Sequence, residues 1–160
     1  MKIVFTLLLL LLFKQALAKD YLSETNPVAF YDEFKRLILE NKKAEVAKML
    51  LYPLATDGIK VDSEEDFLAN YSKVVSPEIL ELLNCTSGKD LWKHNYRGHA
   101  ISQGAIWMDG KYFGNIKPVL KGENYEEYWK QRDAQLADRD NWHLRIYAIF
   151  PSAATCETAP

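Results

Sequence analysis

Cysteine is scarce in this chain, and neither sign of charge dominates it. The 160 residues include two cysteines, and 20 Lys and Arg stand against 22 Asp and Glu, so the formal net charge is −2. Removing Lys2 and Lys14 with a predicted N-terminal leader changes it to −4. Nucleic-acid binding requires a basic surface, so this composition argues against it. The acidic balance also disfavours electrostatic attraction to anionic membranes.

The sequence motifs of common catalytic and metal sites are also missing. There is no Gly-rich phosphate loop and no nucleophile elbow, and the context of Ser102 and Ser152 does not mark either one as a nucleophile. His94 and His99 are five residues apart, a spacing that places the two rings on opposite faces of a strand. No carboxylate or cysteine completes a ligand set around them. We therefore predict neither a metal nor a cofactor.

One long apolar run is present, from Ile3 to Phe13, and it follows the basic Lys2. Ala16-Leu17-Ala18 then fits the small-x-small pattern of a signal-peptidase site. The run is shorter than the roughly 20 residues that a membrane-spanning helix needs. We expect residues 1–18 to be a secretory signal and residues 19–160 to form a single domain with no stable membrane anchor. The mature protein would be secreted or periplasmic; a retained anchor is the alternative.

The two cysteines, Cys85 and Cys156, are expected to form a disulfide in an oxidising compartment. That bond would close a loop of about 70 residues, for which chain-entropy arguments give about 4 kcal/mol. It would also hold the segment 151–160 against the domain. Two free thiols are the alternative. A catalytic cysteine is disfavoured, because no histidine stands in a recognisable relation to either one.

The first half of the domain has helical periodicity. Asn26 and Pro27 are typical of a helix start, and a second helix is predicted over 42–51, where Pro53 ends it. Further helices are predicted to begin at Ser63 and at Ser76, and 59–61 is either a short strand or an extended lead-in. The apolar face of the first helix would contain Phe30, Phe34, Leu37 and Ile38.

The second half has the periodicity of strands. Asp109-Gly110 separates two β-prone runs, 99–108 and 111–120, and this dipeptide is a strong signal for a two-residue hairpin turn. A third strand is predicted over 142–150, and the segment 121–141 between them is predicted to be partly helical. The third strand alternates between an apolar face (Trp142, Leu144, Ile146, Ala148, Phe150) and a mostly polar one (His143, Arg145, Tyr147, Ile149).

Three segments of the chain have a recognisable pattern. They are Phe67-Leu-Ala-Asn-Tyr-Ser-Lys-Val-Val-Ser-Pro-Glu-Ile, Tyr52-Pro53-Leu54 before a glycine turn, and Gly104-Ala-Ile-Trp-Met-Asp-Gly-Lys. These segments resemble small secreted bacterial proteins of the nuclear transport factor 2-like superfamily. The resemblance covers roughly 30–120 and the last strand. It implies an α+β fold in which N-terminal helices pack on a curved antiparallel sheet, forming a cone with an open end. The segment 121–141 is longer than the connection usual in that superfamily.

Members of the superfamily include isomerases, dehydratases, small-ligand binders, assembly modules and toxin-neutralising immunity proteins, so the resemblance does not choose the function. The segment 121–141 offers one candidate site. Its aromatic residues lie among charges of both signs, which is typical of a protein-binding patch. The predicted partner-binding residues are Tyr125, Tyr128, Trp129 and Arg132. The alternative is a solvated helix whose aromatic rings pack on the sheet.

A second candidate site would lie on the sheet itself. If the relevant strand faces coincide, His99, Gln103, His143, Arg145 and Tyr147 would form a polar cluster able to bind an anion or a carbonyl group. The alternative is a solvated sheet face.

The favoured hypothesis is therefore an exported, non-enzymatic protein that binds another protein, for example a periplasmic toxin-neutralising immunity protein. A small-molecule pocket, or an isomerase- or hydrolase-like enzyme using those five residues, is the alternative function. Formation of a homodimer is the alternative to binding a different protein.

Overall fold

The computed structural model describes residues 25–116 and 124–156. The predicted signal over 1–18 and residues 117–120 of the predicted strand lie outside these ranges. The larger elements are α2 (Pro27–Leu39), α3 (Lys43–Lys48), β1 (Leu50–Thr56), α4 (Glu64–Ala69), α5 (Tyr71–Val74), α6 (Pro77–Cys85), β2 (Trp92–His94), β3 (Gly98–Ile101), β4 (Ile106–Tyr112), α7 (Tyr125–Ala137) and β5 (Trp142–Ile149). Short 3₁₀ turns are η2 (Gly88–Asp90), η3 (Arg139–Asn141) and η4 (Pro151–Ala153).

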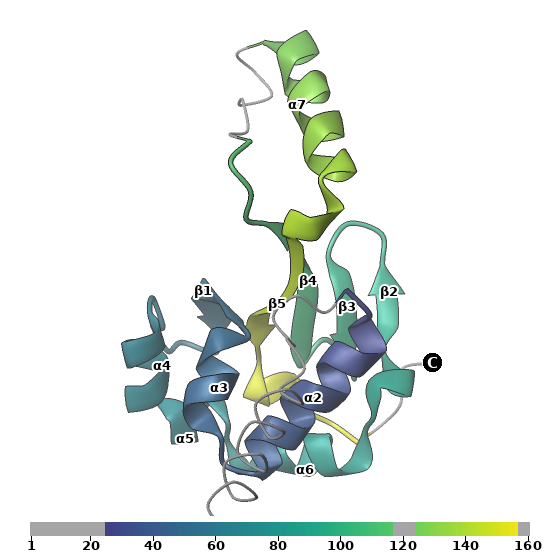
Figure 1. Cartoon of the computed structure of the whole chain (residues 1–160). Helices are drawn as coiled ribbons and strands as arrows, with labels where there is room; N and C mark the ends of the chain where they lie inside the picture. Colours follow the sequence, from purple (N-terminus) through teal and green to yellow (C-terminus); the bar gives the residue numbers. More distant parts are fainter. Residues whose placement is uncertain (1–24, 117–123, 157–160) are drawn as a thin grey trace, which may run out of the picture.

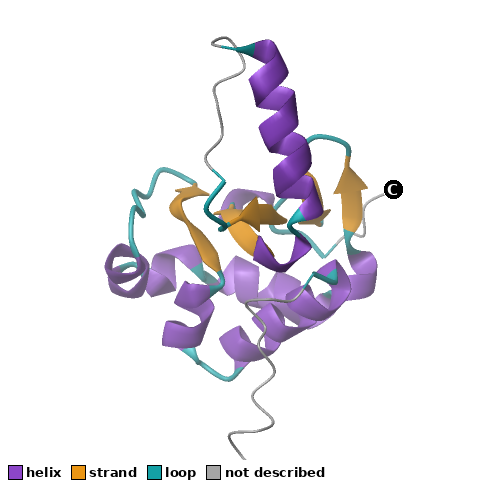
Figure 2. Ribbon diagram, turned by 45° about the horizontal axis from the view of Figure 1, so that its top comes forward, coloured by secondary structure: helices purple, strands orange, loops and turns teal. Residues whose placement is uncertain are grey.

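The five strands form one mixed sheet in the order β1-β5-β4-β3-β2 (Figure 1). Strands β2 to β5 pair antiparallel, while β1 pairs parallel with β5. Helices α2 to α6 gather on one face of this sheet (Figure 2). We refer to the opposite side, which points away from these helices, as the open face. The predicted α+β fold is confirmed, but the sheet is mixed and not wholly antiparallel as predicted, because β1 pairs parallel with β5.

The helix starts follow from local chemistry. The Asn26 side chain accepts hydrogen bonds from the backbone N–H of Val28 and Ala29, at 3.0 and 3.4 Å, and Pro27 occupies the first turn. The Ser63 hydroxyl likewise accepts from the backbone N–H of Asp66 at the start of α4. Both predicted starts are therefore confirmed.

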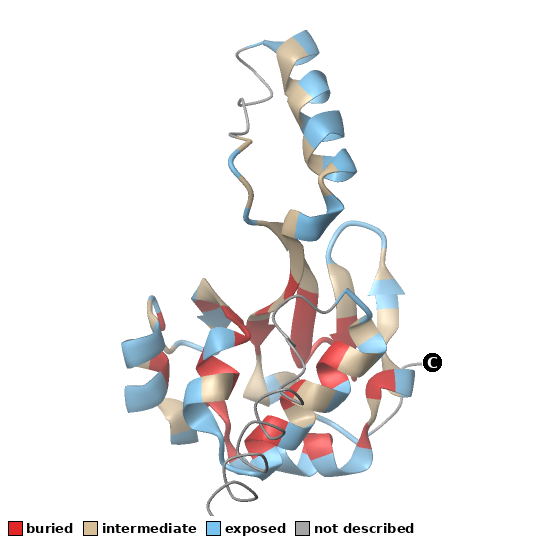
Figure 3. Ribbon diagram, viewed as in Figure 1, coloured by how far each residue is buried: buried red, intermediate tan, exposed pale blue. Residues whose placement is uncertain are grey.

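The main core lies between the helices and the sheet (Figure 3). Helix α2 contributes the predicted apolar face, and α6 contributes Ile79, Leu82 and Leu83. A buried Tyr31 in α2 bonds through its hydroxyl to Thr86 Oγ1 at 2.7 Å, which satisfies its polar atom inside the core. The sheet supplies Ile101, Ile106, Met108, Leu144, Ile146 and Ile149.

The predicted helix over 42–51 is too long. It ends at Lys48, and Leu50 begins β1, in the stretch where Pro53 was interpreted as a terminator. β1 is an edge strand, and Pro53 on it is exposed. An edge strand tolerates proline because the missing N–H need not pair with a neighbour. Of the two alternatives for 59–61, a short strand or an extended lead-in, the structure shows no named strand but a single bridge between Leu54 and Val61.

The predicted hairpin at Asp109-Gly110 is wrong. Both residues lie inside β4, where they pair with Arg145 and Leu144 of β5. The turn occurs earlier, within the predicted strand 99–108, where Ser102 and Gly104 have φ values of 54° and 93°. A Cβ on Gly104 would also lie 2.8 Å from Nε1 of Trp107, so this position requires glycine for two reasons.

The predicted alternation of the last strand holds only up to Ile146. Trp107 pairs with Ala148 and Met108 with Ile146, so Tyr147 is an extra residue that forms a β-bulge. Beyond the bulge the faces exchange. Ile149 enters the main core, whereas Ala148 packs with Trp107 on the open face, and Phe150 packs against them. A bulge cannot be recognised from residue alternation alone, which explains the error.

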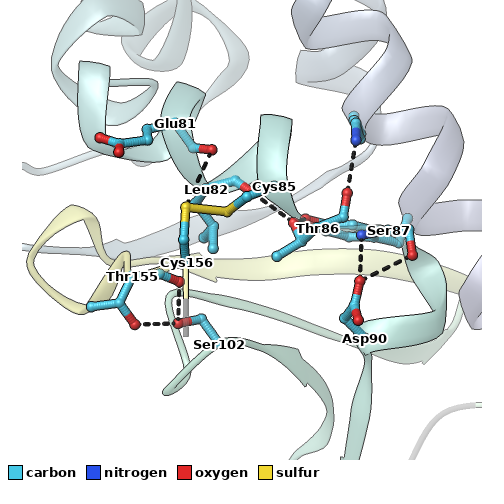
Figure 4. The surroundings of a disulfide bond; sticks show 11 residues. Glu81, Leu82, Cys85, Thr86, Ser87, Asp90, Ser102, Thr155 and Cys156 are labelled. Atoms are coloured by element: carbon cyan, nitrogen blue, oxygen red, sulfur yellow. Dashed lines mark hydrogen bonds between the residues drawn. A yellow bond between two sulfur atoms is a disulfide. The ribbon is translucent and has the colours of Figure 1, made fainter. Parts of the chain in front are cut away.

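The predicted disulfide between Cys85 and Cys156 is confirmed (Figure 4). It joins the end of α6 to the C-terminal segment across 71 residues of chain. Close by, the Ser102 hydroxyl donates to the backbone oxygen of Thr155 at 2.9 Å. The segment after β5 is therefore fixed to both the helical layer and the β3–β4 turn.

Replacing both cysteines, as Cys85→Ala with Cys156→Ala, should lower the free energy of unfolding by about 4 kcal/mol, because the unfolded chain regains the entropy of a 71-residue loop. Urea unfolding of the oxidised wild type and the double variant measures this difference. A change below about 1 kcal/mol would contradict the stabilising role assigned to the bond.

Candidate functional site

Helix α7 extends away from the rest of the molecule, off the end of β4 and β5 (Figures 1 and 2). None of its 13 residues is buried. The prediction that 121–141 is partly helical is confirmed for this part of the segment. The alternative, in which the aromatic rings pack on the sheet, is not what the structure shows. Tyr125 is 63% exposed and Trp129 39%.

The predicted partner-binding residues gather on one face of α7. Together with Leu136 they follow the i, i+3, i+4, i+7, i+11 spacing of a single helical stripe. We call Tyr125, Tyr128, Trp129, Arg132 and Leu136 the α7 stripe. The Trp129 ring lies 5.9 Å from the Tyr125 ring and 5.2 Å from the Tyr128 ring, between centroids, and the Arg132 guanidinium lies 5.7 Å from it.

These contacts order the side chains of the stripe. The Arg132 guanidinium also donates to the Tyr128 hydroxyl at 3.3 Å. Edge-to-face aromatic pairs and a cation over a ring restrict the side chains without burying them. The stripe is therefore a partly ordered aromatic surface that remains accessible.

Helix α7 is attached through its C-terminal end. Trp142 Nε1 donates to the backbone oxygen of Gln135 at 2.6 Å, and the Tyr112 hydroxyl donates to the Asp138 carboxylate at 2.7 Å. Hydrogen bonds from Tyr112 and Asn141 hold the pKa of Asp138 below its usual range. At the other end, Asn124 caps the helix by accepting from the backbone N–H of Glu127. The stripe is thus presented on a helix fixed at its base.

The five residues of the alternative site are not brought together. His99 pairs with the core residue Met108, so it faces the helices, and Gln103 is exposed in the β3–β4 turn. His143, Arg145 and Tyr147 lie on β5 away from the core. His143 and Arg145 gather around Phe113, at 5.6 and 4.7 Å from its ring centroid, whereas Tyr147 lies beside Trp107 at 6.4 Å.

His99 has an unusual environment. Its Nδ1 is buried and has no hydrogen-bond partner in the described structure. Burial lowers the pKa of the His99 imidazole, the nearby Lys93 lowers it further, and Asp109 opposes both. Lys93 is the residue paired with His99 across β2 and β3. A neutral imidazole is therefore favoured in the folded protein.

An aromatic cluster occupies the open face and was not predicted. Trp107 lies at its centre, 5.4 Å from Trp92 and 6.1 Å from His94, between ring centroids. The Arg97 guanidinium lies 5.9 Å from the Trp107 ring, and the Tyr147 hydroxyl donates to the Arg97 backbone oxygen at 2.8 Å. Beside this cluster the surface forms a hollow of about 390 Å³.

A sequence signal for the open face existed. Trp107, Asp109 and Lys111 are spaced by two residues, so a continuous strand places them on one face. The interpretation of Asp109-Gly110 as a turn separated Lys111 from the other two. The electrostatics of Tyr147 agree with the placement of Asp109 and Arg97 on the open face. Burial raises the pKa of the Tyr147 hydroxyl, the charge of Asp109 raises it further, and the charge of Arg97 opposes this rise.

No family model, no curated protein and no solved structure matches this chain. Within residues 25–116 and 124–156, no cluster of three or more metal-ligating side chains is present. Over the same ranges, no helix combines the length and apolar character needed to cross a membrane.

The environment of His99 makes stability depend on pH. The pKa of the His99 imidazole is about 6.5 in the unfolded chain and lower in the folded protein. As the pH drops below 6.5, this imidazole is therefore protonated in the unfolded chain before it is protonated in the folded protein. The free energy of unfolding should therefore fall as the pH drops below 6.5, and His99→Gln should reduce that dependence. Urea unfolding from about pH 8 to about pH 5 tests both proteins. Equal pH dependence in the two would contradict this assignment.

Proposed function

We propose that the protein is exported and acts by binding another protein through the α7 stripe, without catalysing a reaction. The observation that carries the proposal is the exposure of an ordered aromatic stripe on α7, a helix with no buried residue. Tyrosine, tryptophan and arginine are the residue types that most often dominate binding energy at protein interfaces. The stripe contains all three.

The energetics of α7 support this assignment. An isolated helix of this length is marginally stable in water, and most helices gain their stability by packing an apolar face. None of the apolar residues of α7 is buried, although their spacing matches that of helices that dock into a partner's groove. A partner that covers the stripe would supply the packing that the chain itself does not.

Export is supported by the disulfide, since such bonds form and persist in oxidising compartments. The signal pattern at Ala16-Leu17-Ala18 agrees with it. Neutralisation of a toxin in the periplasm is one concrete form of the proposal, in keeping with the resemblance to the nuclear transport factor 2-like superfamily.

Trp129→Ala and Tyr125→Ala should each weaken partner binding by about 30-fold or more, because central aromatic residues contribute about 2 kcal/mol or more at interfaces. The immobilised mature protein is used to capture its partner from an extract of the source cells, and titration calorimetry then gives the Kd of each variant.

Lys130→Ala is the matched control, because Lys130 is an exposed residue on the side of α7 opposite the stripe. The proposal expects one polypeptide to be retained by the wild type and by this control, and to be lost from both stripe variants. Circular dichroism establishes that the variants remain folded. Retention by both Trp129→Ala and Tyr125→Ala would remove the stripe as the binding surface.

A further inference from the structure

The hollow on the open face is an open depression over the sheet. Its lining comes from β1, β4, β5 and the β2–β3 connection, and its volume of about 390 Å³ is within the size range of small-molecule sites. Ala55, Ala148 and Phe150 line it at one end, and Asp109 and Lys111 at the other. Because Ala148 pairs with Trp107, and Lys111 lies four residues further along β4, these two ends are separated by roughly 13 Å of strand.

The two ends differ in chemistry. The first end is apolar, formed by small aliphatic side chains and the Phe150 ring against Trp107. Toward the other end, Arg97 enters from the β2–β3 connection, and Lys111 projects from β4. A bound molecule would therefore meet apolar surface at one end and polar, charged groups at the other.

Positive charge prevails in the described lining of the hollow, whereas negative charge prevails in the whole chain. Arg97 and Lys111 are its two cationic side chains, and Asp109 is the one carboxylate among its described lining residues. The whole chain has a net charge of −2. The ion pairs that the described residues form through Arg36 and Lys60 do not involve Arg97 or Lys111. The described lining of the hollow therefore has one more cation than it has carboxylates.

We propose that the hollow binds a small amphipathic anion, with its apolar body against Ala148 and Phe150 and its carboxylate or phosphate near Arg97 and Lys111. Charge-assisted hydrogen bonds to these cations would supply the preference for an anion. The site is separate from the α7 stripe, so it does not depend on the proposed protein-binding function.

Hydrocinnamate, phenethyl phosphate and the neutral hydrocinnamamide serve as probes, with binding followed by amide chemical-shift changes in the full mature protein. Both anions should bind saturably and shift Ala148, Phe150 and Asp109, and the amide should bind about tenfold more weakly than hydrocinnamate. Whichever anion binds more tightly identifies the head group, and either preference supports the site.

Lys111→Ala should weaken hydrocinnamate binding by about tenfold and leave the amide unchanged. Arg97→Ala tests the second cation, although Arg97 also lies over Trp107. Lys89→Ala, an exposed lysine outside the hollow, is the matched control, and Trp129→Ala should also leave anion binding unchanged. Equal affinity for acid and amide, no effect of Lys111→Ala, or shifts confined to α7 would overturn the proposal. A dimer that forms in solution, detected by sedimentation, and that covers the hollow would also overturn the proposal.

Discussion

The antiparallel pairing of β4 with β5 is the interaction on which the rest of the structure depends. Seven residue pairs, from Ile106 with Ile149 to Tyr112 with Trp142, join the two strands in the middle of the sheet. Their inward side chains form much of the core, and their outward side chains form the floor of the hollow. The far end of the same ladder holds the base of α7. One set of backbone bonds therefore positions the core and both candidate binding surfaces.

The two surfaces differ in how they are built. The hollow lies on a rigid sheet, where the bulge at Tyr147 turns Ala148 outward beside Trp107. Rigid strands hold side chains in defined positions, which suits recognition of a small molecule. Helix α7 has an ordered aromatic stripe but little packing of its own, which suits contact with a larger partner. The helices on the other face, together with the disulfide, stabilise the scaffold that carries both.

Sequence reasoning could predict the features that depend on local chemistry. The start of α2 at Asn26, the disulfide and the helical character of 121–141 all follow from neighbouring residues or from the oxidising compartment. The errors occurred where tertiary pairing overrides local preference. Asp109-Gly110 resembles a turn but is kept extended by β5, and Pro53 is tolerated because β1 lies at an edge. The hollow was missed because it needs the correct strand register, which sequence alternation cannot supply across a bulge.

The central claim is that α7 is held at its base and has no buried residue, so that its stripe is exposed to the proposed partner. Residue-resolved amide hydrogen exchange on the isolated protein tests this claim most directly. The account predicts that α7 amides exchange by local opening, about a hundredfold or more faster than those of β4 and β5, which open only with the sheet. Protection of α7 equal to that of β5 would contradict it, because the helix would then be part of the packed core unit.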